Sequence, residues 1–81
     1  MIIKVQESAK KDLKKIDKTE QKRILIALKE LEKYPKISNI KKLKNFYPPL
    51  RYRVGNYRIL FDIEDNFLIV VNIKHRKDSY K

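Results

Sequence analysis

The chain has 81 residues, of which 21 are lysine or arginine and 10 are aspartate or glutamate, so its formal net charge at pH 7 is +11. A chain this short encloses one hydrophobic core, and residues 1–81 are therefore expected to form a single domain. The hydrophobic content of 42% suffices for that core, whereas the charged content of 38% lies well above the usual ~25%. Positive charge at this density favours a polyanion or an acidic protein as the partner.

The residue types that are missing exclude several classes of function. Without cysteine the sequence offers no disulfide, no thiolate nucleophile and no cysteine-based zinc site, and with a single glycine it offers no glycine-rich phosphate loop. We therefore expect no cofactor and no metal. The first residues lack the apolar run of a signal peptide, and no stretch approaches the ~20 apolar residues of a membrane span. The expected location is the cytoplasm, with no membrane partner.

The first half of the chain is expected to form a strand and a helical hairpin. Residues 2–6 favour a strand, and Ser8 has the position of a cap for the helix that follows. Asp17 and Glu20 have the spacing of a capping box and predict a longer helix that ends near Tyr34. Apolar residues at helical spacing would give both helices one shared buried face: Ala9, Leu13, Ile16, Ile24, Leu25, Leu28 and Leu31.

The second half of the chain is expected to form a loop and three strands. Residues 36–49 are interpreted as a basic loop, because the apolar periodicity lapses there. Residues 50–54 and 57–63 alternate around a Gly-Asn turn, which predicts a β-hairpin, and residues 67–73 predict a third strand. The expected fold class is α+β in the order β-α-α-β-β-β. The helical hairpin would pack on one face of a small curved antiparallel sheet.

The two-residue turn fixes the register of the hairpin and brings cations together. It places Arg53 opposite Arg58, and Arg51 opposite Leu60, on the face away from the helices. Two directly opposed arginines destabilise a hairpin by up to ~1 kcal/mol. Guanidinium groups bind phosphate oxygens in a bidentate way and keep their charge at any working pH. The pattern therefore favours a site for a polynucleotide backbone.

The last strand is expected to extend this cationic face. Hydrophobic matching favours a three-residue turn at residues 64–66 over a two-residue turn, because the shorter turn would place Asn72 on the core side. The same alternation carries Lys74 and Arg76 to the face that holds Arg58. The residues then expected on the helix-covered face are Phe67, Ile69, Val71 and Ile73.

Two residues near the C-terminus are candidates for proton transfer. His75 is the one histidine of the sequence, and a histidine side chain titrates near neutral pH, although a lone histidine is also common as a packing or surface residue. Tyr80 can stack on a base or hydrogen-bond to a phosphate.

The run from Leu50 to Phe61, followed by Ile73 to Tyr80, resembles the RelE toxins of the RelE/ParE superfamily. The shared pattern is an alternating basic strand, a glycine turn, Tyr-Arg, a short meander and then His-Arg-x-x-x-Tyr. The resemblance implies a microbial-ribonuclease-like domain that is the toxin of a type II toxin–antitoxin system. Such a toxin enters the ribosomal A site, cleaves translated mRNA, and is silenced by a cognate antitoxin, which we expect to be acidic.

The resemblance also implies roles for single residues. Arg58 would hold the scissile phosphate, Arg76 would stabilise the transition state or the leaving group, and Tyr80 would stack or handle a proton. Arginines stand at positions 51 and 53, where family members often have lysine, and arginine cannot act as a base. The general base is therefore Tyr80 or His75. The residues expected to bind RNA are Arg51, Arg53, Lys74 and Lys44.

The expected reaction is a metal-independent transesterification by the 2′-OH of the RNA. Two other functions stay open on the sequence: a ParE-like protein that poisons DNA gyrase on a similar fold, and a non-catalytic protein that binds RNA or the ribosome. The combination of His75, Arg76 and Tyr80 favours the ribonuclease over the gyrase poison.

Overall fold

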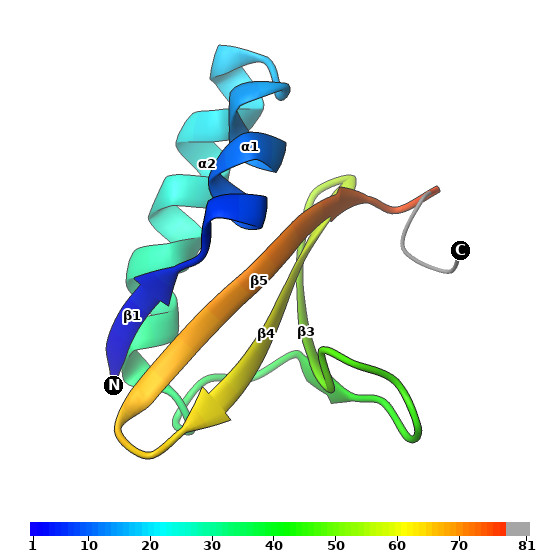
Figure 1. Cartoon of the computed structure of the whole chain (residues 1–81). Coiled ribbons are helices and arrows are strands. Elements are labelled where there is room, and N and C mark those ends of the chain that lie inside the picture. Colours follow the sequence, from blue (N-terminus) through cyan, green and yellow to red (C-terminus); the bar gives the residue numbers. More distant parts are fainter. Residues whose placement is uncertain (78–81) are drawn as a thin grey trace.

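In the computed structural model, residues 1–77 are described, and they form a five-strand sheet with two helices on one face (Figure 1). The elements are, in chain order, β1 (Ile2–Val5), α1 (Glu7–Lys14), α2 (Lys18–Glu30), a 3₁₀ turn (Leu31–Lys33), β2 (Ile40–Lys42), β3 (Leu50–Val54), β4 (Tyr57–Glu64) and β5 (Phe67–His75). The strand order is β1-β5-β4-β3-β2. The α+β class is confirmed. Two details differ from the expectation, namely the additional strand β2 and the parallel pairing of β1 with β5, which makes the sheet mixed.

The two helices begin in different ways. Asp17 caps α2 as expected, since its carboxylate accepts a hydrogen bond from the Glu20 backbone N–H at 2.9 Å. The expected cap at Ser8 is wrong, because Ser8 lies inside α1 and Gln6 takes the cap position without a side-chain bond. The Ser8 hydroxyl instead donates to the backbone carbonyl of Val71 in β5. This bond ties α1 to the sheet.

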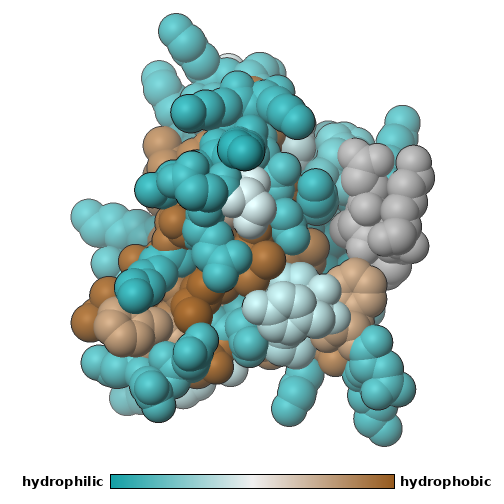
Figure 2. Space-filling model, viewed as in Figure 1, coloured by the Kyte–Doolittle hydropathy of each residue, from teal (hydrophilic) through white to brown (hydrophobic). Residues whose placement is uncertain are grey.

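The hydrophobic core lies between the helices and the sheet. Its largest fully buried side chains come from α2, the 3₁₀ turn and the two longest strands: Ile24, Leu31, Ile59, Phe61, Leu68 and Val70. Figure 2 shows hydrophilic residues over most of the visible surface and hydrophobic atoms where the helices meet the sheet. Within residues 1–77, neither helix combines the length and the apolar character that crossing a bilayer requires.

Strand β2 lies within residues 36–49, for which the sequence predicts a loop. It pairs with β3 in an antiparallel way, with Ile40 opposite Tyr52 and Lys41 opposite Arg51. Its three residues are too few to show an alternating pattern, and apolar residues at positions 37, 40 and 43 have a spacing of three. The pairing to β3 forms this strand, and no local pattern indicates it.

The register predicted for the hairpin of β3 and β4 is confirmed. Arg53 lies opposite Arg58, and Arg51 lies opposite Leu60. Gly55, the first central residue of the turn, has a φ of 60°, which a type II′ turn requires and which side chains other than glycine rarely adopt. The glycine therefore fixes both the turn and the opposed arginines.

The register predicted for β5 is wrong over most of its length. Glu64 pairs with Phe67, so the turn has two residues, and the side chains that enter the core are Leu68 and Val70. The reason is a β-bulge: Leu60 pairs with Asn72 but Phe61 pairs with Val70, which leaves Val71 as the extra residue. The bulge reverses the alternation once, so Ile73 is buried as expected while Phe67, Ile69 and Val71 are only partly buried.

Candidate functional site

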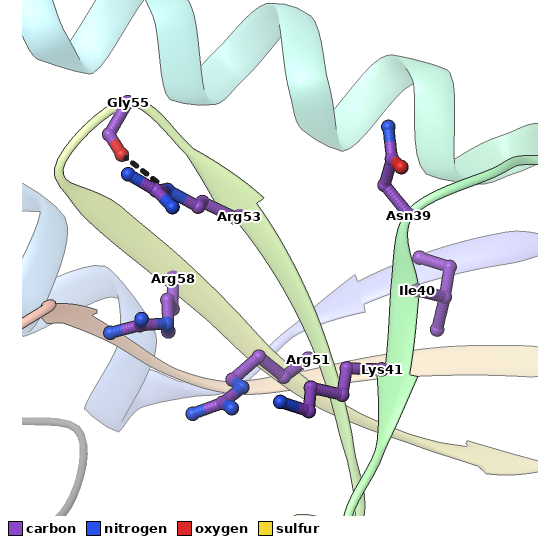
Figure 3. A pocket seen from close by; sticks show the side chains of 7 residues that line it. All are labelled: Asn39, Ile40, Lys41, Arg51, Arg53, Gly55 and Arg58. Carbon is purple, nitrogen blue, oxygen red and sulfur yellow. Dashed lines mark hydrogen bonds between the residues drawn. The ribbon is translucent and has the colours of Figure 1, made fainter.

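A cavity of about 670 Å³ opens on the cationic face of the sheet, where β2, β3 and β4 lie side by side (Figure 3). It brings together three of the five basic residues expected there, and adds a lysine and an asparagine from the segment around β2. The lining residues are Asn39, Ile40, Lys41, Arg51, Arg53, Gly55 and Arg58. Of these residues, all of which lie within residues 1–77, none is acidic.

Backbone carbonyl groups orient two of the arginines. Arg53 donates from Nε to the carbonyl oxygen of Gly55 at 3.2 Å, which folds its side chain back toward the turn (Figure 3). Arg58 donates from Nη1 to the carbonyl oxygen of Arg76, also at 3.2 Å. These bonds hold two directly opposed cations in place despite their mutual repulsion.

Arg51 lies at the buried end of the cluster. Only 4% of its surface is exposed, and its neighbour across the ladder, Leu60, is equally buried at 4%. A charge in such surroundings interacts more strongly with an anion than an exposed charge does, because less water screens it. Arg51 therefore places a guanidinium group that is largely shielded from water at the inner side of the cavity.

Arg76 contacts the hairpin of β3 and β4 through its backbone. Its N–H donates to the carbonyl oxygen of Asn56 at 2.7 Å, and its carbonyl accepts from Arg58. Its exposed side chain is not among the groups that line the cavity within residues 1–77. Tyr80, the candidate for proton transfer, lies outside the described residues.

Lys74 departs from its expected position in the cluster. It lies opposite Arg58 across the ladder, as predicted, but its Nζ atom lies 3.5 Å from Oδ1 of Asp12 in α1 and does not line the cavity. The same carboxylate accepts hydrogen bonds from the backbone N–H of Ile73 at 3.0 Å and from the side chain of Asn72 at 3.3 Å. Asp12 thus binds the edge of β5 at residues 72 and 73, beyond the part that pairs with β1. Its ion pair with Lys74 directs that side chain away from the arginines.

His75 lies on the other face of the sheet. It sits opposite Tyr57, and the two rings meet edge to face with centroids 5.2 Å apart. Its Nδ1 atom accepts a hydrogen bond from the backbone N–H of Lys77 at 3.2 Å. A separate cavity of about 280 Å³ contains it, together with Asp12, Lys15, Ile16, Tyr57, Ile73 and Lys74. The sheet separates this imidazole from the arginine cavity, the one lined by Arg51, Arg53 and Arg58.

Lys44 lies outside the cavity as well. It is an exposed residue in the turn between β2 and β3. Among residues 1–77, no three histidine, aspartate or glutamate side chains gather closely enough to hold a metal ion. The site that the structure offers is therefore built from guanidinium and ammonium groups.

Known proteins share both the sequence and the fold of this chain. A family model described as "ParE toxin of type II toxin-antitoxin system, parDE" matches residues 3–80. Toxin RelE3 of Methanocaldococcus jannaschii is 34% identical over 74 residues, which cover 86% of this chain and 84% of that protein. The chain belongs to the RelE/ParE superfamily and is a toxin of a type II toxin–antitoxin system.

Solved structures place the fold in the same superfamily. The RelE chain in the crystal structure of the RelB–RelE complex from Methanococcus jannaschii has 30% identity and a TM-score of 0.78 to this toxin, over 95% of this chain and 94% of that one. The isolated RelE toxin of E. coli shares the fold at 19% identity, with a TM-score of 0.74 over 91% of this chain and 82% of that one. The resemblance inferred from the basic strand and the His-Arg-x-x-x-Tyr pattern is thereby confirmed.

Sequence reasoning missed Lys41 and Asn39 in this toxin. Both belong to residues 36–49, for which the sequence predicts a loop, so no strand alternation assigns Lys41 to a face. Asn39 precedes β2 with a φ of 68°, a left-handed conformation that asparagine tolerates better than most residues. Its type and its place before a lysine-rich run are the sequence signal for the left-handed residue that precedes β2.

Replacing Asp12 with alanine should destabilise the toxin through β5. Three donors lose their acceptor, so we expect the free energy of unfolding to fall by about 2 kcal/mol and the Tm by about 10 °C. Thermal unfolding followed by circular dichroism measures both. Glu7→Ala, in the same helix but with a side chain 80% exposed, is the matched control and should change stability by less than about 0.5 kcal/mol. Equal stability of the two variants would refute the role given to Asp12.

Proposed function

We propose that this toxin is an endoribonuclease that cleaves translated mRNA in the ribosomal A site. The observation that supports the proposal most is the convergence of Arg51, Arg53 and Arg58 on one cavity. A phosphodiester under attack gains negative charge, and cations already fixed around it stabilise the transition state without reorganising. Guanidinium forks match the geometry of phosphate oxygens, which suits this cavity to a nucleic-acid backbone.

The proposed reaction is metal-independent transesterification. The 2′-OH gives its proton to a base, the 2′-oxygen forms a bond to the adjacent phosphorus, and the bond from phosphorus to the 5′-oxygen breaks. The 5′-oxygen takes up a proton, so the products are a 2′,3′-cyclic phosphate and a free 5′-OH. In this scheme Arg58 holds the scissile phosphate, and Arg76 stabilises the charge that develops on the leaving oxygen.

The placement of His75 bears on the choice of base. Its ring packs on Tyr57 on the helix-covered face, and its Nδ1 atom is engaged by the Lys77 backbone. We therefore assign the proton transfer to Tyr80 in preference to His75. Arg51 and Arg53 bind RNA inside the cavity in this scheme, and Lys44 contacts RNA beyond it.

The proposed partner, besides mRNA and the ribosome, is an acidic antitoxin. Similar proteins from Methanococcus jannaschii and Pyrococcus horikoshii crystallised as complexes of RelE with RelB. The net charge of +11 on this toxin favours a partner of opposite charge, and the arginine cavity is the surface whose coverage would block cleavage. Toxin, antitoxin and target would meet in the cytoplasm.

Mapping mRNA ends in cells that express the toxin tests the proposal. We expect new 5′ ends within translated reading frames, in phase with the codons, and no such ends in untranslated RNA. Expression of the Arg58→Ala variant should remove them.

One observation favours a second candidate, since the matching family model is named for ParE. A gyrase poison would produce DNA damage and leave mRNA intact. Growth inhibition with that signature would replace the ribonuclease proposal, and a protein that only binds RNA would produce neither signal.

A further inference from the structure

A lysine from the edge strand lies directly opposite the most buried arginine of the site. Lys41 in β2 is the Cα partner of Arg51 in β3, and both side chains extend alongside each other to the same side (Figure 3). Like charges in directly opposed positions destabilise a sheet. The pair repeats, one strand over, the like-charge arrangement of Arg53 and Arg58.

The two cation pairs are displaced from each other along the sheet. Arg51 and Arg53 are two residues apart on the same face of β3, so the pairs stand about 7 Å apart along the strand. The four cations line one cavity, and successive phosphates of a single RNA strand lie at a separation of the same order. The arrangement fits two phosphates, one at each pair.

We propose that Lys41 and Arg51 form a second phosphate subsite, which holds the phosphate next to the one at Arg53 and Arg58. The inference rests on the proposed function and names its substrate more closely, as an RNA strand that presents two successive phosphates to the cavity. Arg51 provides a planar fork fixed by burial, and Lys41 provides a mobile ammonium from the exposed side. A mononucleotide fills only one of the two subsites.

Lys42, the neighbouring lysine, distinguishes a role of Lys41 in phosphate binding from the general role of lysine on an edge strand. Lysine on an edge strand also discourages pairing with other chains, and Lys42 serves that purpose as well as Lys41 does. Lys42, however, lies opposite Leu50, whose side chain enters the core, so Lys42 is on the other face and does not line the cavity. The two adjacent lysines therefore form a matched pair for the test.

The test is a thermodynamic cycle between a protein side chain and an RNA linkage. The probe is a short single-stranded RNA with a 2′-deoxynucleotide at the cleavage point, so that it binds without reacting. Two further RNAs carry a neutral methylphosphonate in place of the phosphate on the 5′ or the 3′ side of that linkage. Affinities are measured by titration of the isolated toxin at several salt concentrations.

The expected result is that Lys41→Gln weakens binding of the unmodified RNA about tenfold, with a salt slope about 0.7 smaller, and that Lys42→Gln leaves binding unchanged. One of the two neutral linkages should remove the effect of Lys41→Gln. Thermal unfolding of both variants shows whether they keep the fold.

An equal loss of affinity in the two lysine variants would overturn the inference, and so would an effect of Lys41→Gln that persists with both neutral linkages. Arg58→Ala distinguishes this failure from a failure of the proposed function. If Arg58→Ala also binds the unmodified RNA as tightly as the native toxin, the cavity is not the RNA site.

Discussion

Replacing Arg58 with alanine is expected to slow RNA cleavage by about 10²–10³-fold. Arg58 lies in the cavity between Arg53 and the backbone carbonyl of Arg76, so its guanidinium is fixed before the substrate arrives. A donor fixed in this way stabilises the charge of the transition state at no cost of reorganisation. The rate of cleavage of a ribosome-bound synthetic mRNA measures the effect.

The same substitution should leave the stability of the fold almost unchanged. It removes the bond to the Arg76 carbonyl, which costs about 1 kcal/mol, and it relieves the repulsion by Arg53, which returns a similar amount. Arg23→Ala is the control for loss of an arginine, because Arg23 lies exposed on α2 and does not line the arginine cavity. Undiminished cleavage by a folded Arg58→Ala variant would defeat the assignment of Arg58 to the scissile phosphate.

A single 2′-deoxynucleotide at the cleavage point should stop the reaction. The scheme has no other nucleophile, because it uses the 2′-oxygen of the RNA to attack the phosphorus. Native RNA should give a fragment that ends in a 2′,3′-cyclic phosphate and a fragment that begins with a 5′-OH. Gel analysis of end-labelled mRNA on the ribosome identifies both ends.

The control for this experiment is an mRNA with the deoxynucleotide one position downstream, which should be cleaved at the native rate. Continued cutting at the deoxynucleotide would mean that a water molecule or a protein group attacks the phosphorus. The transesterification scheme would then be excluded, although a role of the arginine cavity in binding the phosphate would survive.

The sequence predicts well the elements whose conformation is set by residues near one another in the chain. The two-residue turn at Gly55 sets the register of the five pairs between β3 and β4, and it therefore places Arg51, Arg53 and Arg58 on one face. The second helix follows from apolar spacing and from the cap at Asp17. Each of these features depends on residues that are close together in the chain.

The elements that were missed depend on partners distant in the chain. No residue pattern in β5 indicates the bulge at Val71. Strand β2 forms because β3 supplies its hydrogen bonds. Lys74 and His75 alternate between the two faces as expected. The ammonium of Lys74, however, pairs with Asp12 of α1, and the ring of His75 packs on Tyr57 on the opposite face. Strand alternation assigns a side chain to a face, and only the folded structure shows which group it contacts there.

The central claim, that the cavity on the open face of β3 and β4 holds the RNA backbone, is tested most directly by NMR of the arginine Nε–Hε groups. The toxin is titrated with the cleavage-resistant RNA, and the signals of Arg51, Arg53, Arg58 and Arg23 are followed. We expect the three signals from the cavity to shift in saturable fashion and further than that of Arg23, whose guanidinium approaches Gly55 from α2 without lining the cavity. Movement of the Arg23 signal, with the cavity arginines unaffected at saturation, would contradict the account.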